Sequence, residues 1–217
     1  VIMTKSFLTS FKEFMEISYW RFKKIKEGKF TNHHYKHFYT DYFSLDDDFY
    51  TDKSILDIGC GPRGSLEWAK MASERIGLDP LADKYLKLGA KEHNMTYIKA
   101  ASENIPFPNE YFDVICSFNS LDHVEDVVKS TEEIKRVLKI GGVFLLIVDI
   151  HNYPTPTEPQ AFKWDFLDEH FSGFKILQQH NLKANKAGRI YTNARNQINA
   201  DINKEANGLL VAKLLKA

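Results

Sequence analysis

From residue 54 onward, short β-rich runs alternate with segments of helical periodicity, and this alternation limits the possible folds more than any other feature of the sequence. The runs at 112–118 and 143–149 are apolar at nearly every position, so both of their faces are expected to be buried. Buried strands that alternate with helices form a parallel α/β sheet. The predicted strands are 54–58, 75–79, 95–99, 112–118, 143–149, 174–179 and 209–215, and the predicted helices between them are 66–71, 81–88 and 124–138.

The first fifty residues precede this alternation. Apolar residues, most of them aromatic, recur every three or four positions in 5–27 and again in 35–43, which predicts helices, and Gly28 ends the first segment. We expect residues 1–50 to form a helical cap and residues 51–217 a core, the two together making a single structural domain.

Composition excludes several classes of protein. The 29 Lys and Arg residues balance 29 Asp and Glu residues, which argues against a non-specific nucleic-acid binder. Two cysteines are too few for a disulfide framework and indicate a reducing compartment. The longest apolar run falls well short of the roughly 18 residues that a membrane helix needs. We expect a cytoplasmic protein with a small-molecule ligand and without nucleic-acid or membrane partners; the sequence does not indicate its oligomeric state.

The segment 55–64, ILDIGCGPRG, carries the chemistry. A strand ends at Gly59 and Gly61, where the missing Cβ atoms allow a ligand to lie against the backbone. A helix is expected to follow, with its partial positive charge facing the loop. Asp79 stands twenty residues after Gly59, at the end of the second strand, where a carboxylate can accept hydrogen bonds from both hydroxyls of a ribose. The pattern indicates an adenosine-containing cofactor.

Asp57 distinguishes between such cofactors. It lies two residues before Gly59, where a carboxylate repels a pyrophosphate and suits a ligand with an ammonium or sulfonium group. Methionine joined to adenosine has both groups. A nicotinamide-dependent oxidoreductase is the alternative, but no catalytic Tyr/Lys or Cys/His pairing accompanies the glycines.

Four segments, LDIGCGPRG, IGLDP, SENIPFPNEYFDVICSFNSLDHVED and EIKRVLKIGGVFLLIV, resemble the class I S-adenosylmethionine-dependent methyltransferases, in particular the small-molecule group that includes quinone-biosynthesis enzymes. The resemblance covers about 54–148. It implies S-adenosyl-L-methionine as cofactor and a Rossmann-like three-layer α/β sandwich with added N-terminal helices, whose mostly parallel seven-stranded sheet has an antiparallel last strand. The cofactor-binding residues that it implies are Asp57, Gly59, Cys60, Gly61, Asp79, Pro80, Ser102, Glu103, Phe118 and Asn119.

Two positions depart from the family pattern. The third glycine of the loop is displaced by one residue, with Arg63 in its usual place and Gly64 following, so we expect a wider loop. Ala101 occupies a position that often carries an acid for the adenine amine, which leaves Ser102 or Glu103 for that contact. These departures keep open a methyltransferase-like binding or regulatory module without catalysis.

Two histidines are candidates for a catalytic base, because ligands of such sheets bind beyond the carboxyl ends of the strands. His123 follows the fourth strand and His151 the fifth. The competing interpretation of His123 is the first residue of a surface helix, with Asp122 as N-cap and Glu125 completing a capping box. His151 can equally make only a local hydrogen bond in its loop.

Other residues near these histidines have two interpretations each. The loop 151–159 contains three prolines and is either a wall of the acceptor pocket, with Glu158 as a weaker candidate base, or a plain connector. The N-terminal aromatics either pack onto the sheet or form a lid from which Tyr39 or Tyr42 reaches the site. We interpret Cys60 and Cys116 as packing residues and find no metal-ligand spacing.

Overall fold

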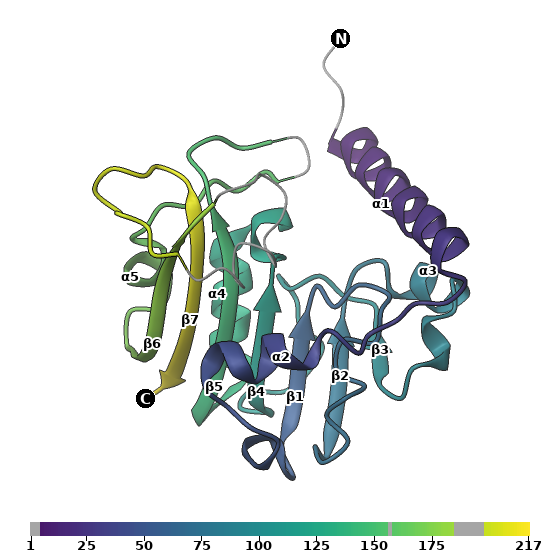
Figure 1. The fold of residues 1–217 in the computed structure, drawn as a ribbon, viewed down its shortest axis with the longest axis horizontal. Coiled ribbons are helices and arrows are strands. Elements are labelled where there is room, and N and C mark those ends of the chain that lie inside the picture. The colour runs from purple at the N-terminus through teal and green to yellow at the C-terminus, as the bar shows by residue number, and fades with distance from the viewer. Residues whose placement is uncertain (1–4, 156–157, 185–197) are drawn as a thin grey trace.

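The computed structural model describes residues 5–155, 158–184 and 198–217, with side chains from residue 11 onward. Its seven strands form one sheet in the order β3-β2-β1-β4-β5-β7-β6 (Figure 1). The strands are β1 (Ser54–Ile58), β2 (Glu74–Leu78), β3 (Thr96–Ile98), β4 (Phe112–Phe118), β5 (Leu138–Ile150), β6 (Phe174–Lys183) and β7 (Gly208–Lys216).

The five strands from β3 to β5 run parallel, and the last strand reverses. β1 pairs in parallel with both β2 and β4, and β5 pairs in parallel with β4. β7 lies between β5 and β6 and is antiparallel to both. This topology confirms the predicted fold class, a Rossmann-like α/β sandwich whose last strand is antiparallel.

Alternate residues of each central strand enter two different cores, so both faces of the sheet are covered. On one face Leu56 and Phe144 pack in a cluster with α4 (Val127–Val137) and α5 (Phe166–His170). On the other face Ile55 and Leu145 pack against aromatic residues of the N-terminal segment, including the fully buried Phe43. The predicted packing of the 35–43 aromatics onto the sheet is therefore confirmed.

The N-terminal segment forms several short elements and one long helix. They are α1 (Lys5–Glu27), α2 (Lys36–Tyr39) and the 3₁₀ turns η1 (Asp41–Phe43) and η2 (Asp48–Tyr50). Figure 1 shows α1 beside α3 (Ala82–Lys87), which is followed by η3 (Ala90–Glu92). Ile17 is buried there with Leu81 and Tyr85. Apolar side chains on the rest of α1 are exposed: Phe11, Phe14, Met15, Tyr19, Phe22 and Ile25.

Several predicted elements differ from the structure in type or in bounds, and β6 ends at Lys183 instead of at residue 179. Residues 66–71 form successive turns instead of a helix, because bonds such as Glu67 N–H to Gly64 O span three residues. The helix predicted from residue 124 starts at Val127, after the 3₁₀ turn η4 (Leu121–His123). β5 starts at Leu138, before the glycine pair 141–142 that was expected to precede it. No helix among the described residues is long and apolar enough to cross a membrane.

Candidate cofactor and acceptor site

The glycine loop follows β1 and turns sharply at two glycines. Gly59 and Gly61 have φ angles of 70° and 58°, in the left-handed region that favours glycine. A Cβ atom on Gly59 would overlap the Cβ atom of Ser120, which follows β4. The requirement for glycine at this position therefore includes close packing between the ends of β1 and β4.

Asp79 faces the same loop from the end of β2. Its carboxylate accepts hydrogen bonds from Leu81 N–H at 2.8 Å and from Gly61 N–H at 3.3 Å. Burial raises the pKa of Asp79 to about 7. The predicted ribose acid and the glycine loop are thus brought together, although the carboxylate is already engaged with the backbone of the loop.

Asp57 is buried at the carboxyl half of β1. The hydroxyl of Tyr39 donates a hydrogen bond to its carboxylate at 2.9 Å, and the hydroxyl of Ser65 donates a second. Burial raises the pKa of Asp57 to about 7, against the opposing effect of the two hydroxyl donors. The sequence suggested Tyr39 only as a residue that reaches the site, and the structure gives it a defined partner there.

Four further residues predicted to bind the cofactor are Cys60, Pro80, Ser102 and Glu103. Cys60 is buried, as expected of a packing residue, and Pro80 is exposed. The Ser102 hydroxyl lies 2.9 Å from that of Ser130 on α4. Glu103 accepts hydrogen bonds from two backbone N–H groups, of residues 125 and 126, before α4. Ser102 and Glu103 therefore tie their turn to α4, and this engagement competes with a role in binding adenine.

At the end of β4, Phe118 and Asn119 turn the chain back toward the sheet. The Phe118 ring packs against Tyr39, with 4.7 Å between the ring centroids. Asn119 has a φ angle of 55°, and its N–H donates to Ile147 O on β5 at 2.8 Å. Because asparagine tolerates the left-handed region better than most residues, this position suits the sharp turn that follows the strand.

Arg63 explains the displaced glycine of the loop. Its guanidinium is largely buried, pairs with Glu27 at 2.7 Å and donates to Thr31 O at 3.1 Å. Gly64 takes the left-handed conformation, with a φ angle of 70°. The inserted arginine thus connects the glycine loop to the N-terminal segment, and no helix begins at the loop to supply a macrodipole.

Helix α1 lies over this loop. The ring of Trp20 would be 3.7 Å from a Cβ atom on Gly61, and Arg63 stands over the Trp20 ring at 5.4 Å. A cavity of about 440 Å³ opens between the segment 28–33 that follows α1 and residues 88–93. The residues that line this cavity include none of the ten predicted to bind the cofactor, so we do not assign it as the cofactor site.

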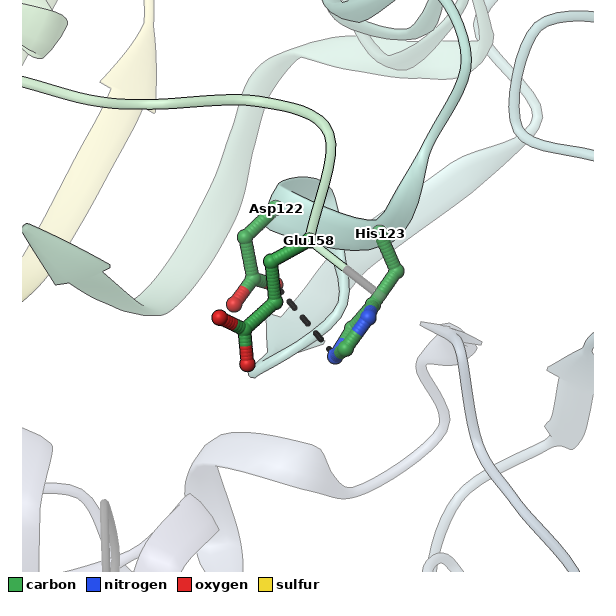
Figure 2. A group of neighbouring side chains, drawn as sticks. All are labelled: Asp122, His123 and Glu158. Atoms are coloured by element: carbon green, nitrogen blue, oxygen red, sulfur yellow. Dashed lines mark ion pairs between the residues drawn. The ribbon is translucent and has the colours of Figure 1, made fainter. Parts of the chain in front are cut away.

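A cluster that sequence spacing did not reveal lies beyond the carboxyl ends of β4 and β5. Asp122 and His123 from η4 face Glu158 from the loop after β5, as Figure 2 shows. Asp122 Oδ1 lies 3.8 Å from His123 Nε2. Because Asp126, and not Asp122, caps α4 by accepting from Lys129 N–H, the alternative interpretation of His123 as the first residue of that helix is wrong.

His151 lies directly after β5 with its ring held by the backbone. Its Nδ1 is 2.8 Å from Tyr153 O, and its Nε2 is buried without a hydrogen-bond partner among the described residues. A carbonyl oxygen only accepts hydrogen bonds, so Nδ1 carries the proton and the Nε2 lone pair is left to accept one. Of the predicted wall 151–159, Pro156 and Thr157 lie outside the described residues.

Part of the chain is similar in sequence to known proteins. Residues 56–146 match the methyltransferase domain family. The chain is 33% identical over 100 residues to the uncharacterized methyltransferase YcgJ of Bacillus subtilis, covering 43% of this chain and 39% of that protein. It is 32% identical over 107 residues to the ubiquinone/menaquinone biosynthesis C-methyltransferase UbiE of Proteus mirabilis, covering 44% and 42%. The chain thus spans about two fifths of the length of these relatives.

Solved structures show the same fold. The YcgJ protein of B. subtilis has a TM-score of 0.58 at 20% identity, covering 81% of this chain and 98% of that one. The [4+2]-cyclase SpnF has a TM-score of 0.55 at 19% identity, covering 76% of each chain. Together, the sheet order and the domain match over residues 56–146 support a class I S-adenosylmethionine-dependent methyltransferase, and they imply S-adenosyl-L-methionine as the cofactor.

Proposed function

We propose that this chain transfers the methyl group of S-adenosyl-L-methionine to a small-molecule acceptor. The observation that carries the proposal is the convergence of Asp79, Gly61 and Asp57 at the carboxyl ends of β1 and β2, where an open α/β sheet binds its ligand. Asp79 suits the ribose hydroxyls, and the carboxylate of Asp57 supplies negative charge near the cationic methionine group. Residues 1–50 act as a cap that is held to the glycine loop by the contacts of Trp20 and Glu27 with Arg63.

The reaction that we propose is an in-line displacement. The bond between sulfur and the methyl carbon breaks and its electron pair stays on sulfur, while a lone pair of the acceptor forms the new bond to carbon. Most of the acceleration comes from holding the two partners in line. When the acceptor loses a proton, Nε2 of His151 receives it, since this nitrogen is the unprotonated one. His123 also faces the acceptor end.

The acceptor is proposed from the relatives and the site together. UbiE is named for ubiquinone and menaquinone biosynthesis, and a relative in Arabidopsis thaliana, 29% identical over 121 residues, is named a tocopherol O-methyltransferase. Quinone-type phenols are therefore the first acceptors to screen, followed by sugar-like hydroxyl compounds. A cytoplasmic location remains part of the proposal.

Thermal melting of the wild type and of Asp79→Ala with S-adenosylhomocysteine, S-adenosylmethionine and NAD tests cofactor binding. A ligand at 100 times its dissociation constant adds about 2.7 kcal/mol, which shifts the midpoint by roughly 5–10 °C for a chain of this size. We expect such a shift with both sulfur nucleosides and its loss in Asp79→Ala. A shift with NAD alone would instead support the oxidoreductase alternative.

Cofactor binding does not distinguish an enzyme from a module that binds without turnover. SpnF, named for a [4+2] cyclisation, has the same fold, so fold and chemistry are separate questions. Formation of S-adenosylhomocysteine together with a methylated phenol is the decisive result. Binding without any such product across the acceptor screen would favour the regulatory module.

A further inference from the structure

Asp122 is a buried carboxylate that the methyl-transfer proposal does not use. The residue is fully buried at the carboxyl end of β4, and neither of its oxygens accepts a hydrogen bond from the described part of the chain. Burial raises the pKa of Asp122. Buried charges in proteins are ordinarily paired or bound to a metal, because an unpaired one is costly to desolvate. Its oxygens point into the cluster with His123 and Glu158 (Figure 2).

The three side chains offer one ligand atom each, and these atoms all lie within 4.8 Å of one another. Zinc binds imidazole nitrogen and carboxylate oxygen at about 2.0–2.2 Å in a tetrahedral arrangement, which places two ligand atoms about 3.4 Å apart. The 3.8 Å between Asp122 Oδ1 and His123 Nε2 is close to that value. Rotation of the exposed His123 and of the half-buried Glu158, which accepts a hydrogen bond from the Thr155 hydroxyl at 3.2 Å, would bring all three atoms onto one ion.

The backbone around the cluster is held in place. Asp122 and His123 share the turn η4, and Gln160 N–H donates to Asp122 O at 3.3 Å. The Gln160 side chain donates to Val124 O at 3.1 Å and to the carbonyl of the next residue at 3.0 Å. These bonds hold the segment that carries Glu158 against η4, so the two sides of the cluster are kept at a fixed separation.

The surrounding charge favours a cation. Asp149 and His151 interact electrostatically with the cluster, so three carboxylates share this region with two histidines. Burial, together with the carboxylates of Asp122 and Glu158, raises the pKa of Asp149 to about 6. A bound cation would relieve both the mutual repulsion and the desolvation of the buried carboxylate.

We infer that Asp122, His123 and Glu158 form a binding site for one divalent transition-metal cation, with zinc as the reference ion. One imidazole and two carboxylates suit this class better than Mg²⁺ or Ca²⁺, which take mainly oxygen ligands in larger numbers. Three protein ligands leave a fourth position open. The next step rests on the proposed function: a hydroxyl oxygen of the acceptor occupies the open position, and the metal ion lowers the pKa of that hydroxyl. His123 is then a metal ligand, and His151 is left as the base.

Zinc binding to the full chain, measured by calorimetry without cofactor and by metal content after dialysis, tests the site. We expect one ion per chain, and an affinity reduced about 100-fold or more in Asp122→Asn and in Glu158→Gln, since even residues that only support a ligand change affinity 10- to 100-fold. Glu132→Gln is the matched control, because Glu132 is exposed on α4 and stands outside the cluster; it is expected to bind zinc like the wild type.

A thermal melt of Asp122→Asn separates lost binding from lost folding. Without metal, this variant is expected to melt at or above the wild-type temperature, because it removes a buried charge. With zinc, the melting temperature is expected to rise in the wild type only. The inference is overturned by a wild type that binds no zinc, or by variants that bind it equally well. Binding of S-adenosylhomocysteine to Asp122→Asn tests the proposed function separately. Failure of the metal site and failure of the proposed function can therefore be distinguished.

Discussion

The phenol of Tyr39, in the N-terminal segment, donates a hydrogen bond to the buried carboxylate of Asp57 on β1, with 2.9 Å between the two oxygens. The Tyr39 ring also packs against Phe118 at the end of β4. A residue that precedes the sheet in sequence therefore connects the two strands that flank the candidate site. The same side chain therefore contacts the candidate site and helps to pack the N-terminal segment onto the sheet.

Tyr39→Phe keeps the ring and removes this donor. A hydrogen bond to a charged group contributes about 1.5–3 kcal/mol, and one between neutral groups about 1 kcal/mol. Because Asp57 has a pKa of about 7, we expect the larger loss of unfolding free energy near pH 8.5 and the smaller near pH 5.5. Urea denaturation at both values measures it, with the exposed Tyr153→Phe as control. Equal losses at the two pH values would contradict an ionised partner.

Cofactor affinity is expected to depend on pH through Asp79. Burial raises the pKa of Asp79 from its ordinary value to about 7 in the free protein. In the proposed site the ionised carboxylate accepts both ribose hydroxyls, so we expect binding to favour the deprotonated form and the affinity to rise with pH. For one such group the gain between pH 6 and pH 8 is about tenfold. Calorimetry with S-adenosylhomocysteine measures this slope, and Asp79→Asn is expected to bind more weakly at both values with a smaller slope.

The same raised pKa values set the sign of the stability profile without ligand. Between about pH 4 and pH 7 the folded protein holds protons on Asp57 and Asp79 that the unfolded chain has released. The free energy of unfolding therefore falls as the pH rises through this window. The melting temperatures of Asp79→Asn and of the wild type are expected to be similar at pH 4 and to differ increasingly toward pH 8. The melting temperature of the variant is expected to depend less on pH.

The strands were predictable because burial on both faces leaves a continuous apolar run. β4 has the predicted bounds, Phe112–Phe118, and the glycines 59 and 61 turn the chain directly after β1, as predicted. Residues 66–71 were misread because Leu66 and Ala69, both buried, are three positions apart, a spacing that suits a helix and successive three-residue turns alike.

The acceptor cluster was not predictable from spacing. Glu158 reaches Asp122 and His123 only through the path of the loop after β5 and the bonds of Gln160. Asp122 and Glu125 also fit the N-capping pattern of a helix, and the local sequence supports that interpretation equally well. Only the structure shows that Asp126 caps α4. The unpartnered state of a buried carboxylate is a tertiary property that no motif encodes.

Gly59 and Gly141 offer a matched pair for the close approach at the glycine loop. Both have positive φ angles, 70° and 74°, so alanine at either costs about 1–2 kcal/mol for the left-handed conformation. Only at Gly59 would the new methyl group overlap Ser120, whereas at Gly141 nothing in the described structure lies within 4 Å of it. Overlap of this kind adds about 1–3 kcal/mol. Denaturant unfolding is expected to show the larger loss of unfolding free energy in Gly59→Ala. Equal losses would mean that the end of β4 shifts at little cost to make room for the methyl group.

Arg63→Ala tests whether the cap is fixed to the cofactor loop. The change removes the ion pair with Glu27, the bond to Thr31 O and the ring contacts with Trp20 and Phe30. We expect amides of the α1 segment 11–27 to exchange hydrogen faster, while those of the central strands stay protected.

Lys84→Ala is the matched control for that measurement. It breaks the pair of Lys84 with Glu13, which also joins α1 to the core but is exposed on both sides and is worth at most about 1 kcal/mol. If the cap is held mainly at the loop, exchange in α1 rises in Arg63→Ala and changes little in Lys84→Ala. Equal increases of exchange in the two variants would indicate that α1 is attached along its whole contact with α3 and not mainly at the glycine loop. In that case, the displaced glycine of the loop would have no connection to the cap.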